Sequence, residues 1–223
     1  MTYSKIIAID GPVASGKTSV GKLVADSLGF KFFDTGLLYR ATTWGYLQSK
    51  IKPEEHILIS ELVEKISVSF VSPLEEAQIF FENIQVNSFL KIPEIDKQVS
   101  YIASIPELRG KLLELQRTIA KHGEVVMVGR DIGTVILPAA DLKIFLMASV
   151  KERARRRYEE FNSSGISLNL DEVENMIQKR DQTDSERKHA PLRKDSSAHL
   201  LETDNLSLEY ISEKIINLFY GLG

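Results

Sequence analysis

The sequence of 223 residues contains no cysteine. Disulfide bonds and metal sites built on thiolates are therefore excluded, and the composition is typical of a chain from a reducing compartment. The sequence also lacks an apolar run long enough to cross a membrane, and none near its start has the length of a secretion signal. We therefore expect a cytoplasmic protein with no membrane partner.

The chain also has little excess charge of either sign. Its 28 lysines and arginines stand against 31 aspartates and glutamates, which leaves a net charge of −3. A field this weak indicates no general attraction to nucleic acids, so any polyanionic ligand must be met by a local cluster of cations. No internal repeat or low-complexity tract is present. We expect no nucleic-acid partner, and we expect a monomer.

The most informative motif that is present lies near the start of the chain. An apolar run at residues 6–9 leads into Gly-Pro-Val-Ala-Ser-Gly-Lys-Thr at residues 11–18, which fits the pattern G-x-x-x-x-G-K-[ST] at every fixed position. Glycines let the backbone N–H groups of such a loop approach phosphate oxygens, and the following helix start adds partial positive charge. The motif therefore predicts a site for a nucleoside triphosphate.

Individual positions of this loop have distinct expected roles. Lys17 can reach the β- and γ-phosphates, the Thr18 hydroxyl is placed to bind Mg²⁺, and Ser19 follows close to the expected α-phosphate. The residues predicted to bind the triphosphate are Gly11, Pro12, Val13, Ala14, Ser15, Gly16, Lys17, Thr18 and Ser19. A glycine-rich turn without a ligand is the alternative, and the strand and helix expected on either side of the loop argue against it.

Strand and helix patterns alternate along most of the chain. Short apolar runs typical of buried parallel strands occur at 6–9, 31–33, 125–128, 143–146 and 200–202. Helical periodicity is found at 17–28, 37–50, 57–66, 107–122, 151–161, 170–183 and 207–218. This alternation predicts an α/β fold with a five-stranded parallel sheet covered by helices on both faces. Ligands of such sheets bind at the carboxyl ends of the strands.

One stretch interrupts the alternation. Between residues 67 and 89, three short apolar segments at 68–71, 78–81 and 84–86 are separated by turn residues, which predicts a small antiparallel β insert. Because insertions in α/β proteins often carry function, we favour an insert that covers a ligand over one with a purely structural role.

A second anion site is indicated after the run at residues 31–33. Thr35, Gly36 and Arg40 place a hydroxyl, free backbone N–H groups and a guanidinium at the start of a helix, and this combination can bind a phosphate. Asp34, beside them, is available to a magnesium-bound water. A simple capped helix with Arg40 on a solvated face explains this segment equally well when it is considered alone.

More cations follow later in the chain. Arg130 and Asp131 come directly after the run at 125–128, and charges at the end of a buried strand are costly unless they are paired or used. Arg130 suits a phosphate, and Asp131 suits the amino or hydroxyl groups of a ligand. The arginines between 153 and 187, taken alone, fit solvated helix faces. Together these cations supply what phosphoryl transfer between two phosphate-bearing molecules requires.

With these residues in view, the chain resembles the bacterial-type cytidylate kinases, which are nucleoside monophosphate kinases of the P-loop class. The resemblance covers essentially the whole chain. It rests on I-A-I-D-G-P-x-x-S-G-K at the start, D-T-G-x-L-Y-R at 34–40, the β insert, G-R-D-I-G-T-V-I-L-P at 129–138, and R-D-x-x-D-x-x-R followed by A-P-L at 180–192. It implies direct in-line transfer of the ATP γ-phosphoryl group to CMP or dCMP with Mg²⁺.

The resemblance further implies one P-loop kinase domain with three parts. These are a core (about 1–62, 106–150 and 171–223), an NMP-binding β insert (about 63–105) and a helical lid (about 151–170). The nearest alternatives are a P-loop kinase for another acceptor, such as UMP, AMP or a shikimate-like alcohol, and a regulatory nucleotide-binding module. Against the regulatory module, the sequence has no N-K-x-D guanine motif.

Roles for individual residues also follow from the resemblance. Residues expected to act in catalysis are Lys17, Arg130, Arg153, Arg157 and Arg180. Residues expected to bind the acceptor nucleotide are Asp34, Thr35, Gly36, Tyr39, Arg40, Ser100, Arg109, Arg130, Asp131, Arg180, Asp184 and Arg187. Thr18 and Asp34 are expected to hold the metal. Ser100, Arg109 and Asp131 match positions associated with cytosine, whose amino donor and ring acceptors suit such side chains.

Overall fold

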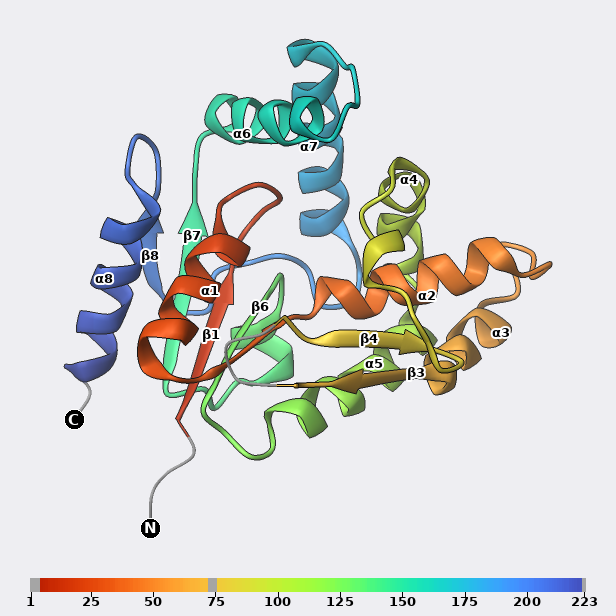
Figure 1. Cartoon of the computed structure of the whole chain (residues 1–223), viewed down its shortest axis with the longest axis horizontal. Coiled ribbons are helices and arrows are strands. Elements are labelled where there is room, and N and C mark those ends of the chain that lie inside the picture. Colours follow the sequence, from red (N-terminus) through yellow and green to blue (C-terminus); the bar gives the residue numbers. More distant parts are fainter. Residues whose placement is uncertain (1–4, 72–75, 222–223) are drawn as a thin grey trace.

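A computed structural model of the chain describes residues 5–71 and 76–221. Its centre is a parallel sheet of five strands in the order β2-β6-β1-β7-β8 (Figure 1). The strands are β1 (Ile6–Asp10), β2 (Lys31–Asp34), β6 (Val125–Gly129), β7 (Leu142–Met147) and β8 (His199–Glu202). The predicted five-stranded parallel sheet is therefore confirmed, and the carboxyl ends of all its strands lie at one edge.

Helices cover both faces of this sheet, as the alternation predicts. Ile7 and Ile9 of β1 pack in one apolar cluster with α1 (Lys17–Leu28) and α8 (Leu208–Tyr220). Ala8 between them belongs to the cluster on the other face, with α2 (Gly36–Gln48) and α5 (Pro106–Ala120). Successive side chains of a strand point to opposite faces, so a short run of apolar residues supplies both cores.

The predicted β insert is present beside α2. β3 (Ile66–Ser69), β4 (Gln78–Phe81) and β5 (Ile84–Gln85) form an antiparallel sheet, and the 3₁₀ turn η2 (Asn87–Phe89) follows it. Trp44 of α2 packs edge-on against Phe81 and stacks on Phe89, with centroid distances of 5.5 and 6.1 Å. Gly45 permits this contact, because a Cβ atom there would lie 2.3 Å from the ring of Phe81.

Two details of this region differ from the expectation. The helix expected at 57–66 is shorter: α3 (His56–Glu61) ends early, the 3₁₀ turn η1 (Leu62–Lys65) follows, and Ile66 pairs with Phe81 as the first residue of β3. Pairing with another strand thus overrides the local helical pattern. α4 (Pro93–Ile102) was not predicted, although it begins with proline and buries Ile95, Val99 and Ile102 at helical spacing.

Two further helices, α6 (Val150–Ser163) and α7 (Leu170–Glu186), lie beyond the carboxyl end of the sheet (Figure 1). Ser149 caps α6, and Asn169 and Glu172 form a capping box at the start of α7. The two helices pack on each other through a small apolar cluster that includes Ala154 and Val173. The segment predicted as a lid comprises most of α6, the connection to α7 and the first residue of α7. The division of the chain into core, insert and lid stays a prediction.

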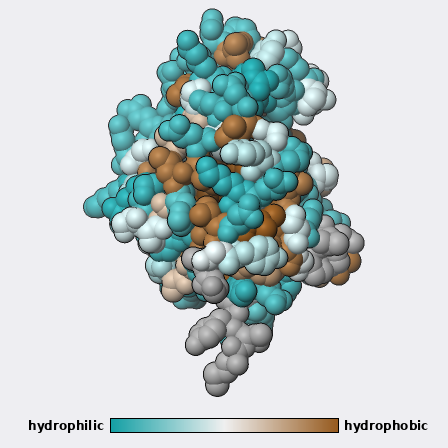
Figure 2. All heavy atoms as spheres, turned by 90° about the vertical axis from the view of Figure 1, so that its left-hand side faces the viewer, coloured by the Kyte–Doolittle hydropathy of each residue, from teal (hydrophilic) through white to brown (hydrophobic). Residues whose placement is uncertain are grey.

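Hydrophilic and hydrophobic residues are unevenly distributed on the side of the molecule that carries α8. Figure 2 shows mostly hydrophilic residues over the upper part of this side, where α6 and α7 lie, and hydrophobic residues gathered in its middle. Exposed apolar side chains on β7, β8 and the turn before α8 include Met147, Leu200 and Leu206. Within the described ranges, no helix has the length and apolar character needed to cross a bilayer.

Candidate active site

A cavity of about 850 Å³ lies at the carboxyl ends of the strands, between the phosphate loop, α2, α4, α6 and α7. Its volume is near the upper end of the usual range for ligand sites. Most of the predicted site residues line it: Val13, Ala14, Gly16, Lys17, Thr18, Ser19, Asp34, Thr35, Gly36, Tyr39, Arg40, Ser100, Arg109, Arg130, Asp131, Arg157, Arg180, Asp184 and Arg187. The fold thus brings segments from the whole length of the chain to one place.

Four predicted residues do not line the cavity: Gly11, Pro12, Ser15 and Arg153. The first three belong to the phosphate loop itself, and the Ser15 hydroxyl is buried without a hydrogen-bond partner. Arg153 donates to the carbonyl oxygens of Ala148 (3.0 Å) and Val13 (3.2 Å) and pairs with Asp181 (2.6 Å). In this structure Arg153 braces α6 against the loop, and its expected contact with a transferring phosphate stays a prediction.

Lys17 stands at the phosphate-loop end of the cavity and is almost fully buried. Its Nζ donates to the carbonyl oxygen of Pro12 at 2.8 Å. Burial, and next the charge of Arg130, hold the pKa of Lys17 well below its usual value of 10.5, while the charge of Asp34 acts in the opposite direction. A buried cation beside other cations is poised to gain stability from an anion.

Thr18 and Asp34 lie next to Lys17 and contact each other. The Thr18 hydroxyl donates to Oδ2 of Asp34 at 2.9 Å, and Oδ1 of Asp34 accepts the backbone N–H of Gly36 at 2.9 Å. Hydroxyl and carboxylate oxygens are ligand types that Mg²⁺ accepts, so this pair fits the predicted metal site. Elsewhere in the part of the chain that the structure describes, no three His, Cys, Asp or Glu side chains gather as a metal site.

Asp10 connects the phosphate-loop strand to the segment that carries Arg130 and Asp131. It is buried, and its two carboxylate oxygens accept the backbone N–H groups of Ile132 (2.7 Å) and Gly133 (2.8 Å). These residues open the single π-helical turn η3 (Ile132–Ile136). Burial raises the pKa of Asp10 to about 6, although the two backbone hydrogen bonds lower it.

This raised pKa predicts a pH-dependent contribution to stability. Between the usual value of 3.8 and about 6, the unfolded chain releases the proton while the folded chain keeps it. The Asp10 contribution to the free energy of unfolding therefore falls by about 3 kcal/mol as the pH rises through this window. We expect Asp10→Asn to lack this decline, which urea unfolding of both proteins from pH 3.5 to 7.5 would measure. Parallel profiles for the two proteins would contradict the assignment.

Close packing joins the ends of β2 and β6. The Thr35 hydroxyl donates to the carbonyl oxygen of Val128 at 3.0 Å. A Cβ atom on Gly129 would lie only 2.6 Å from this hydroxyl, so glycine is required where the two strand ends meet. The contact positions Arg130, the next residue, beside the start of α2.

Buried ion pairs surround Asp131 at the cavity wall. Asp131 accepts hydrogen bonds from Arg109 through Oδ2 and from Arg187 through Oδ1, the latter at 3.2 Å. The guanidinium of Arg109 also lies 5.4 Å from the ring centroid of Tyr39. Burial, and then the charge of Arg109, lower the pKa of Arg187. These ion pairs fix the direction of Arg109 and Arg187, which both line the cavity. Ser100 lines the cavity as well.

Arg130 and Arg180 also line the cavity. Nε of Arg130 donates to Oδ2 of Asp184 at 2.8 Å. Burial, and then the charge of Arg130, lower the pKa of Arg180 to about 10. Burial alone would raise the pKa of Asp184, but Arg130 and Arg180 outweigh it and lower this pKa. These cations repel one another, and Asp184 offsets part of the repulsion.

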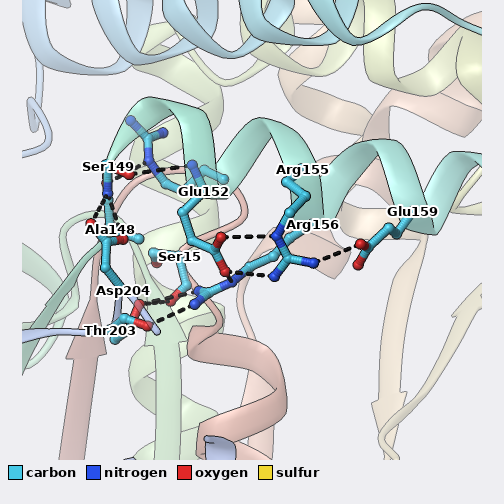
Figure 3. A network of polar contacts seen from close by, with 10 residues as sticks. Ser15, Ala148, Ser149, Glu152, Arg155, Arg156, Glu159, Thr203 and Asp204 are labelled. Atoms are coloured by element: carbon cyan, nitrogen blue, oxygen red, sulfur yellow. Dashed lines mark hydrogen bonds and ion pairs between the residues drawn. The ribbon is translucent and has the colours of Figure 1, made fainter. Parts of the chain in front are cut away.

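A polar network fixes the first turns of α6 to the core. Figure 3 shows Arg156 held by Glu152 and reaching Thr203, which follows β8. Arg156 donates to the Thr203 carbonyl oxygen at 2.7 Å and to its hydroxyl at 3.1 Å, and that hydroxyl contacts the Ser15 carbonyl oxygen at 3.4 Å. Asp204 accepts the backbone N–H of Ser149. Any movement of α6 must therefore break these contacts or bend the chain beyond them.

A second cluster surrounds Asp96 of α4. Its carboxylate pairs with Arg40 and Arg157 at 2.6 Å each, and Arg180 lies 3.8 Å away. Arg40 also donates to the carbonyl oxygen of Leu90 at 2.8 Å. The three arginines come from α2, α6 and α7, so one carboxylate connects helices that are far apart in the sequence.

Comparison with known proteins identifies the family. The family model described as cytidylate kinase matches residues 7–220. The chain belongs to the cytidylate kinase family. The cytidylate kinases of an Exiguobacterium species and of Listeria monocytogenes serotype 4a are each 43% identical over 218 residues, which cover 98% of this chain and 97% of theirs. Phosphoryl transfer to CMP or dCMP is the function of this family, so the expected activity and enzyme class are confirmed.

Solved structures of other kinases share the fold of this cytidylate kinase family member. A gluconokinase from Sinorhizobium meliloti has a TM-score of 0.52 at 15% identity, with 100% of this chain and 95% of that chain covered. A shikimate kinase from Acinetobacter baumannii, solved with shikimate, has a TM-score of 0.51 at 16% identity, with 98% and 94% covered. At this identity the likeness shows the P-loop kinase fold alone.

Two acidic residues that support the site of this family member, without lining its cavity, were not found from the sequence. Asp10 directly precedes the phosphate loop, and its position at the end of a buried strand was the available signal. Asp96 lies in a helix that was not predicted, in the first turn after Pro93. Acidic residues are common in the first turn of a helix, so the local sequence does not distinguish Asp96 from an ordinary helix-terminal residue.

Proposed function

We propose that the cavity binds ATP at the phosphate loop and CMP or dCMP at the arginine cluster, with direct transfer between them. The observation that carries this proposal is that two anion-binding arrangements face one cavity. Lys17 and the loop line one part, and Arg40, Arg130 and Arg180 line another. An alcohol acceptor would not require a second set of cations, so the arrangement favours an acceptor that carries a phosphate.

No protein nucleophile is needed in this mechanism. The acceptor phosphate is already ionised near neutral pH and can attack once it is positioned in line. Lys17 would stabilise the charge on the β- and γ-phosphates, and Arg130 and Arg180 would stabilise charge on the transferring group. Asp131, Arg109 and Ser100 would form the wall for the cytosine base.

Mg²⁺ would be held by the Thr18 hydroxyl and the Asp34 carboxylate, directly or through water. Bound there, the ion would neutralise part of the triphosphate charge. Both residues line the cavity, and the hydrogen bond between their side chains holds them together.

The acceptor assignment is tested by a coupled assay for ADP formation with CMP, dCMP, UMP, AMP and shikimate as acceptors. We expect turnover with CMP and dCMP at least tenfold faster than with the others at equal low concentration. Faster turnover with shikimate or AMP would contradict the proposal, and ATP binding without acceptor-dependent turnover would favour a regulatory role. Light scattering of the purified chain would test the predicted monomer.

The metal assignment predicts a changed magnesium requirement in Asp34→Asn. Because one anionic ligand is lost, we expect the Mg²⁺ concentration for half-maximal activity to rise about three- to tenfold at saturating nucleotides. Asp26→Asn is the matched control, since Asp26 is exposed on α1 and lies outside the cavity. An unchanged magnesium midpoint in Asp34→Asn would rule out a direct or water-mediated role for this carboxylate.

A further inference from the structure

Asp96 is a nearly buried carboxylate with three arginine neighbours. Its side chain is 7% exposed, and each oxygen has its own short contact, Oδ1 with Nη2 of Arg40 and Oδ2 with Nη2 of Arg157. Nη1 of Arg180 lies 3.8 Å from Oδ1. A carboxylate this buried is costly alone and is stabilised here by charge-assisted hydrogen bonds on both oxygens.

The three arginines line the cavity, whereas Asp96 does not. The carboxylate therefore contacts the guanidinium groups on their side away from the nucleotide site. Without it, three cations from three helices would repel one another, and each has a long side chain with many rotamers. Asp96 offsets this repulsion and fixes one arrangement of the group.

The contact between Asp96 and Arg157 also crosses between two predicted parts of the chain. Asp96 belongs to α4, within the predicted insert, and Arg157 belongs to α6, within the predicted lid. Arg157 is further restricted by Glu160 at 2.6 Å and by the ring of Phe161, whose centroid lies 4.4 Å from its guanidinium carbon. With these neighbours, the Asp96 contact sets where this arginine meets the cavity.

We propose that Asp96 is a positioning residue that assembles Arg40, Arg157 and Arg180 into one phosphate-facing wall and joins the lid to the insert. The inference rests on the proposed function, in which Arg40 and Arg180 serve the phosphates, and on the catalytic role expected for Arg157. Asp96 itself touches no substrate and acts through the arginines.

This role has a distinct kinetic signature. Loss of the carboxylate leaves the arginines present but poorly placed, so the transition state loses more stabilisation than the bound ground state. The net positive charge near the acceptor phosphate rises, so attraction for CMP does not weaken. Turnover is therefore expected to fall while the affinity for CMP is kept or increased.

The test compares Asp96→Asn with Glu94→Gln at saturating ATP and varied CMP. Glu94 is the matched control because it is an exposed acid in the first turn of the same helix. We expect Asp96→Asn to lower kcat about tenfold, with a KM for CMP that is unchanged or lower. Glu94→Gln is expected to stay within twofold of the unmodified chain in both constants.

Asp96→Glu supplies a second variant, which keeps the charge and moves the carboxylate by one methylene. We expect it to recover most of the turnover lost in Asp96→Asn, and it serves in the same comparison if the asparagine variant does not fold. A kcat equal to that of Glu94→Gln would overturn the proposal. A fall in kcat accompanied by a similar loss of CMP affinity would also overturn it, since that pattern indicates damage to α4.

These outcomes are separate from failure of the proposed function. If the unmodified chain and Glu94→Gln do not phosphorylate CMP, the proposed function fails. If both do and Asp96→Asn matches them, only the role of Asp96 fails.

Discussion

Lys17→Met is expected to lower kcat by about 10³-fold or more while the fold is retained. Loss of a single neutral oxyanion-hole donor costs about 10²–10³ in kcat, and Lys17 would supply a full charge from a nearly buried position. Among the residues that the structure describes, its Nζ has one hydrogen-bond acceptor, the Pro12 carbonyl oxygen. Methionine keeps the length of the apolar stem, so the cation is removed with little change in packing.

Stability provides the internal check on this result. A buried lysine whose pKa is lowered by burial, and next by Arg130, destabilises the nucleotide-free protein, so its loss is expected to leave the melting temperature unchanged or higher. Lys214→Met, at an exposed position of α8, is the control for the loss of a positive charge and should retain normal activity. A Lys17→Met variant with turnover within tenfold of the unmodified chain would contradict the site assignment.

The segments of the site that come directly after a strand in the sequence could be predicted from the sequence. The phosphate loop is specified by glycines, a lysine and a hydroxyl at fixed spacing, and Arg130 and Asp131 stand at the end of an apolar run. In a parallel sheet the carboxyl ends of strands meet at one edge, so short-range patterns were enough to place these segments together. The residue types then indicate phosphates.

Contacts between distant helices could not be predicted in this way. Helical spacing places Arg153 and Arg157 on one face of α6, yet Arg157 lines the cavity while Arg153 turns to Asp181 and the Val13 carbonyl oxygen. Periodicity fixes the face of a helix and leaves open which acceptors a long side chain finds. The arrangement of the three arginines around Asp96 depends on how four helices pack, and no local sequence pattern indicates that packing.

Asp131→Asn is expected to lower kcat/KM for CMP by about 10²–10³-fold and to narrow the preference for CMP over UMP at least tenfold. Cytosine presents an amino donor where uracil presents a carbonyl acceptor. The carboxylate of Asp131, on the wall proposed for the base, would therefore attract cytosine and repel uracil. Asparagine can turn its amide N–H toward the uracil carbonyl. It also gives up the charge that holds Arg109 and Arg187, so both arginines lose their common partner.

The measurement is kcat/KM for CMP and UMP with both proteins, and the KM for ATP is its control. Asp131 pairs with Arg109 and Arg187, on the wall that we propose for the cytosine base. The KM for ATP should therefore stay within about threefold if the effect is confined to base recognition. A general loss of packing would raise both nucleotide KM values together. An equal fall in kcat/KM for CMP and UMP, with the KM for ATP unchanged, would show that Asp131 positions its arginines and does not contact the base. Discrimination between CMP and UMP would then be assigned to Ser100 or Arg109.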